Sequence, residues 1–218
     1  SPLDKRYYNF LGVETLTQNG FDVEIWDLTP FFHEDLIDKI ILDGQVIFDN
    51  YKEFNTKNDI ETALSTIPPN TIVNSIISFE LKTFFIYRLL SKYKIKYCVL
   101  QMISIPPPPS KKTTNGYIRS LINKITSLSV AHIFIGLCNK ILLRYYFVFN
   151  ICPADLALLS GERSLEIVRD PISVKTHKIW AHLWDYDIYL REKNISVIQE
   201  PTLGVFLDEY FPLHTDLD

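Results

Sequence analysis

The sequence has few cysteines and glycines, and two common nucleotide-binding motifs are missing. Cys98, Cys138 and Cys152 are odd in number and too widely spaced for a disulfide framework or a paired zinc knuckle. They are typical of buried thiols in a reducing compartment. The seven glycines form neither GxGxxG nor GxxxxGKS/T, so Rossmann-type NAD binding and a P-loop are not expected. No GxSxG nucleophile elbow occurs either, which leaves a hydrolase without support.

Length and composition place the chain among globular proteins. Its 218 residues suit one domain or slightly more, and 47% hydrophobic with 22% charged residues excludes a disordered chain. No basic-then-apolar leader precedes the first periodic segment, which favours the cytoplasm.

Acidic residues are absent from the middle third of the chain. Residues 81–154 contain eleven lysines and arginines, and all 26 acidic residues lie outside this stretch, although the net charge is −4. This asymmetry indicates an anionic partner, either nucleic acid, lipid headgroups or phosphates of a small molecule. The alternative is that these cations belong to ordinary solvated helix faces.

Apolar periodicity predicts an α/β fold with a Rossmann-like parallel sheet and crossover helices. The predicted strands are 22–28, 45–48, 71–78, 96–103, 155–159, 178–183 and 203–208. The predicted helices are 4–19, 33–41, 57–67, 79–93, 117–128 and 185–193. A proline-rich loop, 105–116, interrupts the alternation.

Residues 129–151 form an unusually apolar segment. Its polar residues His132, Asn139, Lys140 and Arg144 share one narrow helical stripe. Charges near its centre argue against a transmembrane span and favour a helix in a membrane interface, with Lys140 and Arg144 facing headgroups. The alternative is a helix packed on the sheet whose cations reach water.

Loops after the strands are the first places to look for a ligand, because ligands bind beyond the carboxyl ends of parallel strands. Ser160, Gly161 and Arg163 follow one such strand and are candidates for binding a phosphate. His182, Asp185 and Asp187 offer three hard ligands, but a turn with Asp185 as helix cap is the commoner use of such residues. We therefore expect no metal and no cofactor.

Three stretches resemble bacterial glycosyltransferases of surface polysaccharide synthesis with the two-domain GT-B fold. These are 6–28, with its Asn19-Gly20 helix stop, His182-Leu-Trp-Asp-Tyr-Asp-Ile-Tyr-Leu190, and Val205-Phe-Leu-Asp-Glu-Tyr-Phe-Pro-Leu-His-Thr-Asp216. The resemblance implies that 1–200 is the acceptor-side domain, with 105–152 as a basic amphipathic insertion. It implies that 201–218 is a linker and the first strand of a second domain. The strand that opens such a fold has no room before the first helix.

The resemblance also implies a substrate and a location. Such enzymes transfer a sugar from a nucleotide sugar to a lipid-linked or polysaccharide acceptor, at the inner face of the membrane. The cations that would then attract headgroups or a diphosphate are Lys111, Lys112, Arg119, Lys140 and Arg144. An acidic residue or a histidine would remove the proton of the acceptor hydroxyl. The candidates for this catalytic role are Asp185, Asp187, Asp208 and His214.

Two other functions remain open. The chain is alternatively a non-catalytic module that binds a sugar or nucleotide, or a scaffold of a polysaccharide complex. A nucleic-acid-binding protein is a further alternative, which the charge favours. However, the aromatic residues of the basic stretch lie in a strongly apolar helix rather than on a polar surface, so no nucleic acid is expected as partner.

Overall fold

The structure is a computed structural model that describes residues 3–34, 48–101, 130–165 and 169–182, and also Tyr186, Tyr189, Leu190 and Lys193. The chain divides into two compact units. The N-terminal unit comprises residues 1–71 and 92–95, and the C-terminal unit comprises 72–91 and 96–218. Each unit is described by itself.

The N-terminal unit begins with two short helices, α1 (Lys5–Phe10) and α2 (Val13–Gln18). Asp4 caps α1 by accepting a 2.7 Å hydrogen bond from the Tyr7 amide. Gly12 lies between the helices with a φ of +64°, a left-handed conformation that suits glycine. One helix was predicted over 4–19, and this residue divides it into two. The predicted stop is confirmed, because Asn19 is the C-cap of α2.

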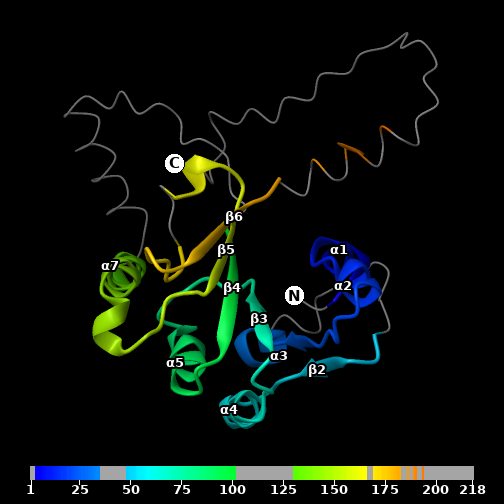
Figure 1. Cartoon of the computed structure of the whole chain (residues 1–218). Helices are drawn as coiled ribbons and strands as arrows, with labels where there is room; N and C mark the ends of the chain where they lie inside the picture. Colours follow the sequence, from blue (N-terminus) through cyan, green and yellow to red (C-terminus); the bar gives the residue numbers. More distant parts are fainter. Residues whose placement is uncertain are drawn as a thin grey trace. The chain divides into compact units, whose positions relative to one another are not determined.

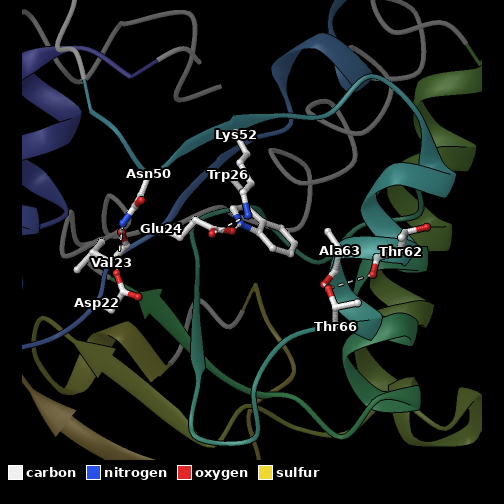
Figure 2. A network of polar contacts seen from close by, with 9 residues as sticks. All are labelled: Asp22, Val23, Glu24, Trp26, Asn50, Lys52, Thr62, Ala63 and Thr66. Atoms are coloured by element: carbon white, nitrogen blue, oxygen red, sulfur yellow. Dashed lines mark hydrogen bonds and ion pairs between the residues drawn. The ribbon is translucent and has the colours of Figure 1, made fainter.

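A two-stranded parallel sheet follows, formed by β1 (Ile25–Asp27) and β2 (Tyr51–Glu53). Figure 2 shows the polar contacts around it. The Asn50 side chain donates hydrogen bonds to Asp22 Oδ1 and to the Val23 carbonyl, both at 3.2 Å. Glu24 forms a 2.7 Å ion pair with Lys52 and accepts a hydrogen bond from the Trp26 indole. These contacts link the start of β2 to the chain that leads into β1.

Two helices complete the described part of this unit, α3 (Thr29–Phe32) and α4 (Lys57–Ser65). The Thr56 side chain caps α4 by accepting from the Asp59 amide. At the other end, the Thr66 hydroxyl donates to the Ala63 carbonyl at 3.0 Å (Figure 2). Helix α4 confirms the helix predicted over 57–67, and Ile60 and Leu64 are its buried residues.

The C-terminal unit contains a four-stranded parallel sheet in the order β3-β4-β5-β6 (Figure 1). The strands are β3 (Ile72–Ser75), β4 (Lys96–Gln101), β5 (Leu156–Leu159) and β6 (His177–Trp180). The connections contain α5 (Phe84–Lys92), α7 (Val130–Arg144) and the short 3-10 helices η2 (Tyr146–Phe149) and η3 (Glu162–Leu165). The predicted α/β class with parallel strands is confirmed.

Aromatic side chains of α5 and β4 form the core of this unit. Tyr87 and Tyr97 are almost completely buried, and their ring centroids lie 5.7 Å apart in an edge-to-face arrangement. The Phe79 ring contacts Tyr87 at 5.0 Å. Val99 and Leu159, from the two central strands, are fully buried. The helix and the sheet therefore share one apolar core.

Several predicted elements differ at their ends. Helix α5 begins at Phe84 rather than at residue 79, because the Thr83 hydroxyl donates to the Ser78 carbonyl and fixes a turn before it. Strand β2 was not predicted, and α3 lies before the helix predicted over 33–41. The residues outside the described ranges are 1–2, 35–47, 102–129, 166–168, 183–185, 187–188, 191–192 and 194–218. The predictions for 105–116, 117–128 and 201–218 fall there and stay predictions.

Candidate functional site

A pocket of about 170 Å³ lies at the carboxyl edge of the four-stranded sheet. The loop after β3, the last residues of β4, η3 and the segment before β6 surround it. The residues that line the pocket are Ser75, Ile76, Ile77, Ser78, Leu100, Gln101, Ser164, Arg169 and Asp170. Pockets for drug-sized ligands usually have about 300–1,000 Å³, so this one suits a smaller group such as a phosphate or a single sugar ring.

The position of the pocket follows from the register of the strands. Ser75 of β3 is paired with Val99 of β4, and Gln101 of β4 is paired with Leu159 of β5. All three strands run in the same direction, so their carboxyl ends meet at one edge of the sheet. Side chains that follow the strands are therefore brought together there, as is usual in open parallel sheets.

The walls of the pocket carry hydroxyl and amide groups. The Gln101 amide nitrogen donates to the Ser164 carbonyl at 3.0 Å, and its oxygen accepts from the Arg169 amide at 3.0 Å. This orientation of the amide is assigned from these two partners. The Ser164 and Ser160 hydroxyl groups lie 3.2 Å apart. Gln101 thus holds the two segments after β5 against the end of β4.

Asp170 lines the pocket and is 8% exposed. Its Oδ1 is 3.1 Å from the Tyr87 hydroxyl, which is also 2.5 Å from the Ile77 carbonyl oxygen and 3.2 Å from Ser75 Oγ. Burial raises the pKa of Asp170 above its ordinary value. Burial also raises the pKa of Tyr87 and of Tyr97, so both phenols stay neutral at physiological pH.

Arg169 is the cation of the pocket. It is exposed, and among the described residues it forms no ion pair with an acidic side chain. The described residues of the pocket therefore provide one guanidinium group, three serine hydroxyl groups, one amide and one buried carboxyl group. Such a set of groups binds oxyanions and sugar hydroxyl groups by hydrogen bonding.

A second surface is formed by α7 and η2, and we refer to it as the α7–η2 face. Lys140 and Arg144 are exposed on α7, and among the described residues neither has a carboxylate within ion-pair distance. Leu142 is buried, whereas Phe134 is 63% exposed and both Phe147 and Val148 are 62% exposed. Other exposed apolar residues of this face are Ile135, Leu137, Ile141, Tyr145 and Phe149.

Contacts with α5 and the preceding turn hold the α7–η2 face in place. The Asn139 side chain accepts a 2.8 Å hydrogen bond from the Leu81 amide. The rings of Phe149 and Phe84 pack edge-to-face at 5.7 Å. The backbone turns after η2 at Asn150, which has a φ of +56°. In the part of the chain that the structure describes, no helix has the length and apolar character needed to cross a membrane.

The structure describes some of the residues predicted for a site. Ser160 and Gly161 follow β5 as expected, and Ser160 contacts the pocket through Ser164. Gly161 has a φ of +116°, so its conformation alone gives a reason for glycine there. Arg163 is a residue of the 3-10 helix η3. Their role in binding a phosphate stays a prediction.

The other predicted site residues lie outside the described residues. These are Lys111, Lys112, Arg119, Asp185, Asp187, Asp208 and His214. His182 is described, and its ring packs on Tyr186 with centroids 4.6 Å apart. Among the described residues, no three histidine, cysteine or acidic side chains are arranged to hold a metal ion.

Sequence reasoning did not identify most of the pocket. Ser75 and Gln101 lie inside the strands predicted over 71–78 and 96–103, whereas in the structure β3 and β4 end at these two residues, so the predicted boundaries concealed their place at the carboxyl edge. Arg169 and Asp170 follow no periodic pattern, and only the fold places them beside Ser75. In comparisons with known proteins, no family model, curated protein or solved structure matches the chain.

Proposed function

We propose that this chain is the acceptor-side part of a bacterial glycosyltransferase of surface polysaccharide synthesis, and that it works at the inner face of the cell membrane. The donor is a nucleotide sugar, and the acceptor is a lipid-linked or polysaccharide sugar. The resemblance of three stretches supports this proposal, as does the parallel sheet with crossover connections. The finer assignment to the GT-B type is part of the proposal.

The observation that carries the proposal is the exposure of the α7–η2 face. Large apolar side chains rarely stay exposed together on a protein that contacts only water. Phe134 of α7 and both Phe147 and Val148 of η2 are more than half exposed. Lys140 and Arg144 are exposed on α7, and neither forms an ion pair with an acidic side chain among the described residues. A face of this kind suits the boundary between acyl chains and anionic headgroups. Each cation near such a surface contributes about 1 kcal/mol.

The pocket supports a ligand that carries sugar or phosphate oxygens. Hydroxyl groups of Ser75, Ser78 and Ser164 and the Gln101 amide provide donors and acceptors at one edge of the sheet. Asp185, Asp187, Asp208 and His214 remain the candidates for the base that takes the acceptor proton.

A transfer assay on the full-length gene product tests the proposal. Vesicles that carry a polyprenyl-phosphate-linked sugar are incubated with each of a panel of labelled nucleotide sugars, and label in the lipid fraction is counted. We expect label from one nucleotide sugar, and we expect Arg169→Gln to raise KM by about tenfold, because it removes one charged hydrogen-bond donor. Lys175→Gln is the control, since Lys175 is exposed and outside the pocket.

Two results would point to the alternatives. Binding of a nucleotide sugar without any transfer would contradict the enzyme and favour a non-catalytic binding module. Retention of a short oligonucleotide at a salt concentration that abolishes vesicle binding would favour a nucleic-acid-binding protein, since such binding also depends on cations.

A further inference from the structure

The Tyr87 hydroxyl has one proton and two acceptors. The Ile77 carbonyl oxygen lies 2.5 Å away, and Asp170 Oδ1 lies 3.1 Å away. Ser75 Oγ, at 3.2 Å, is a third neighbour that either donates or accepts. A phenol cannot donate to a carbonyl and to a carboxylate at the same time with full strength. The arrangement therefore determines which group holds the second proton.

The Tyr87 proton lies in the shorter of these contacts, the hydrogen bond to the Ile77 carbonyl oxygen. Two oxygen atoms 2.5 Å apart are at the lower limit of O–H···O hydrogen bonds and need a proton between them. With the Tyr87 proton on the Ile77 carbonyl, the phenol oxygen faces Asp170 only as an acceptor. The contact to Asp170 is then satisfied when the carboxyl group is protonated and donates to Tyr87. An ionised Asp170 would keep the hydrogen bond from the Phe79 backbone amide, but its Oδ1 and the Tyr87 oxygen would be two acceptors that face each other in a buried position.

We propose that Asp170 retains its proton in weakly acidic solution and that the pocket above it is an oxyanion site, whose affinity falls as this proton leaves. The raised pKa of the buried carboxyl group agrees with this geometry. The inference deepens the proposed function by giving the pocket a ligand class, a phosphate or similar oxyanion. It does not require that a sugar be transferred.

Charges around the pocket explain the choice of ligand. With Asp170 neutral, Arg169 is the charged group among the described lining residues, and the hydroxyl groups of Ser75, Ser78 and Ser164 complete a set of donors. With Asp170 ionised, its charge cancels that of Arg169 and repels an anion. The site therefore binds an anion only in its protonated form.

Among the described groups around the pocket, Asp170 is the one whose charge changes with pH. Tyr87 on α5 and Tyr97 on β4 face Asp170, and both stay neutral because burial raises their pKa. Arg169 stays positively charged throughout. Glu80, on the segment after β3, is exposed and does not line the pocket. These are the titratable and charged neighbours of Asp170 in the part of the chain that the structure describes.

Titration calorimetry with sodium sulfate tests the inference on the whole chain. Sulfate keeps its charge over the pH range of the titration, so a change in affinity with pH reflects a change in the protonation of the protein. We expect the affinity to fall as the pH rises through the raised pKa of Asp170, above the ordinary aspartate range, by up to tenfold per pH unit, because only the protonated fraction binds. Asp170→Asn should bind sulfate with no pH dependence, and Arg169→Gln should weaken binding at every pH. Glu80→Gln is the matched control and should behave as the wild type.

Other outcomes would overturn the inference. Sulfate affinity that is independent of pH in the wild type, or that keeps its pH dependence in Asp170→Asn, would do so. If Asp170→Asn does not fold, the pH dependence of the carboxyl ¹³C chemical shifts is measured on the wild-type protein instead. One aspartate should titrate above the others, and uniform titration in the ordinary range would contradict a protonated Asp170.

Two molecules carry such a phosphate, a nucleotide sugar and a lipid-linked sugar. Uridine diphosphate in solution and polyprenyl phosphate in neutral vesicles are therefore compared as competitors of sulfate. Competition by either one identifies the source of the phosphate. Competition by neither, together with weak sulfate binding, would show an adventitious ion only and would contradict a phosphate site. Loss of transfer with sulfate binding retained would instead reject the proposed enzyme alone.

Discussion

The Tyr87 hydroxyl lies 3.1 Å from Asp170 Oδ1 and joins helix α5 to a residue 83 positions later in the chain. The Tyr87 ring lies in the core against Phe79 and Tyr97, while Asp170 lines the pocket. One side chain therefore connects the packing of the C-terminal unit with its candidate site. We expect changes to this pair to affect both the stability of the chain and the proposed binding of an oxyanion.

Removal of the Tyr87 hydroxyl should destabilise the chain. Tyr87→Phe keeps the ring but leaves the Ile77 carbonyl and Asp170 without their buried partner. We expect the free energy of unfolding in urea to fall by about 1–3 kcal/mol. Tyr145→Phe is the control, because Tyr145 is exposed on the α7–η2 face. Equal stability of the two variants would contradict the network.

The raised pKa of Asp170 predicts a pH dependence of stability. The folded state holds this proton more tightly than the unfolded state, whose aspartate pKa is about 3.9. The contribution is therefore complete below that value and is lost as the pH rises through the folded-state pKa, with a slope of at most about 1.4 kcal/mol per pH unit. The difference between wild type and Asp170→Asn in urea isolates it. A difference that is constant with pH would reject the shift.

The three thiols should react in a defined order. Cys98 is buried in β4, and burial raises the pKa of its thiol to about 11. Cys152 is exposed and Cys138 is intermediate. We expect iodoacetamide to modify Cys152 in the native protein and Cys98 only after unfolding, as peptide mass spectrometry measures. Early modification of Cys98 would show that β4 is not buried in the sheet.

Two glycines should respond oppositely to alanine. Gly161 has a φ of +116°, so Gly161→Ala should cost about 1–3 kcal/mol of stability through backbone strain. Gly136 lies within helix α7 and has no atom within 4 Å of an added Cβ, so Gly136→Ala should stabilise by about 0.5–1 kcal/mol. Thermal unfolding measures both. Destabilisation by Gly136→Ala would indicate that α7 is not helical at this position.

The sequence was sufficient to predict the class of fold but not the residues of the pocket. Apolar runs predicted β4 and β5, the two central strands, because a strand buried on both faces has little need for polar residues, whereas all four residues of the edge strand β6 are exposed. Strand β2, with the sequence Tyr-Lys-Glu, is short and half exposed, so no such signal existed. Arg169 and Asp170 reach the pocket through long-range contacts, which local patterns do not encode.

The exposure of α7 shows a second limit of sequence reasoning. Its apolar residues were compatible with a helix packed on the sheet and with a helix at a membrane interface. The structure shows that Phe134, Leu137 and Ile141 are exposed and that Leu142 is buried. The difference depends on which elements pack against the helix, and periodicity does not carry this information.

Sedimentation with anionic vesicles tests the membrane-facing role of the α7–η2 face most directly. The full chain is compared with two double variants that change the charge equally, Lys140→Glu with Arg144→Glu and Lys175→Glu with Lys178→Glu, and all four residues are exposed. We predict that the wild type binds, that the α7 variant binds at least about tenfold more weakly, and that the β6 variant changes little. Equal loss in both variants, or no binding of the wild type, would contradict the account.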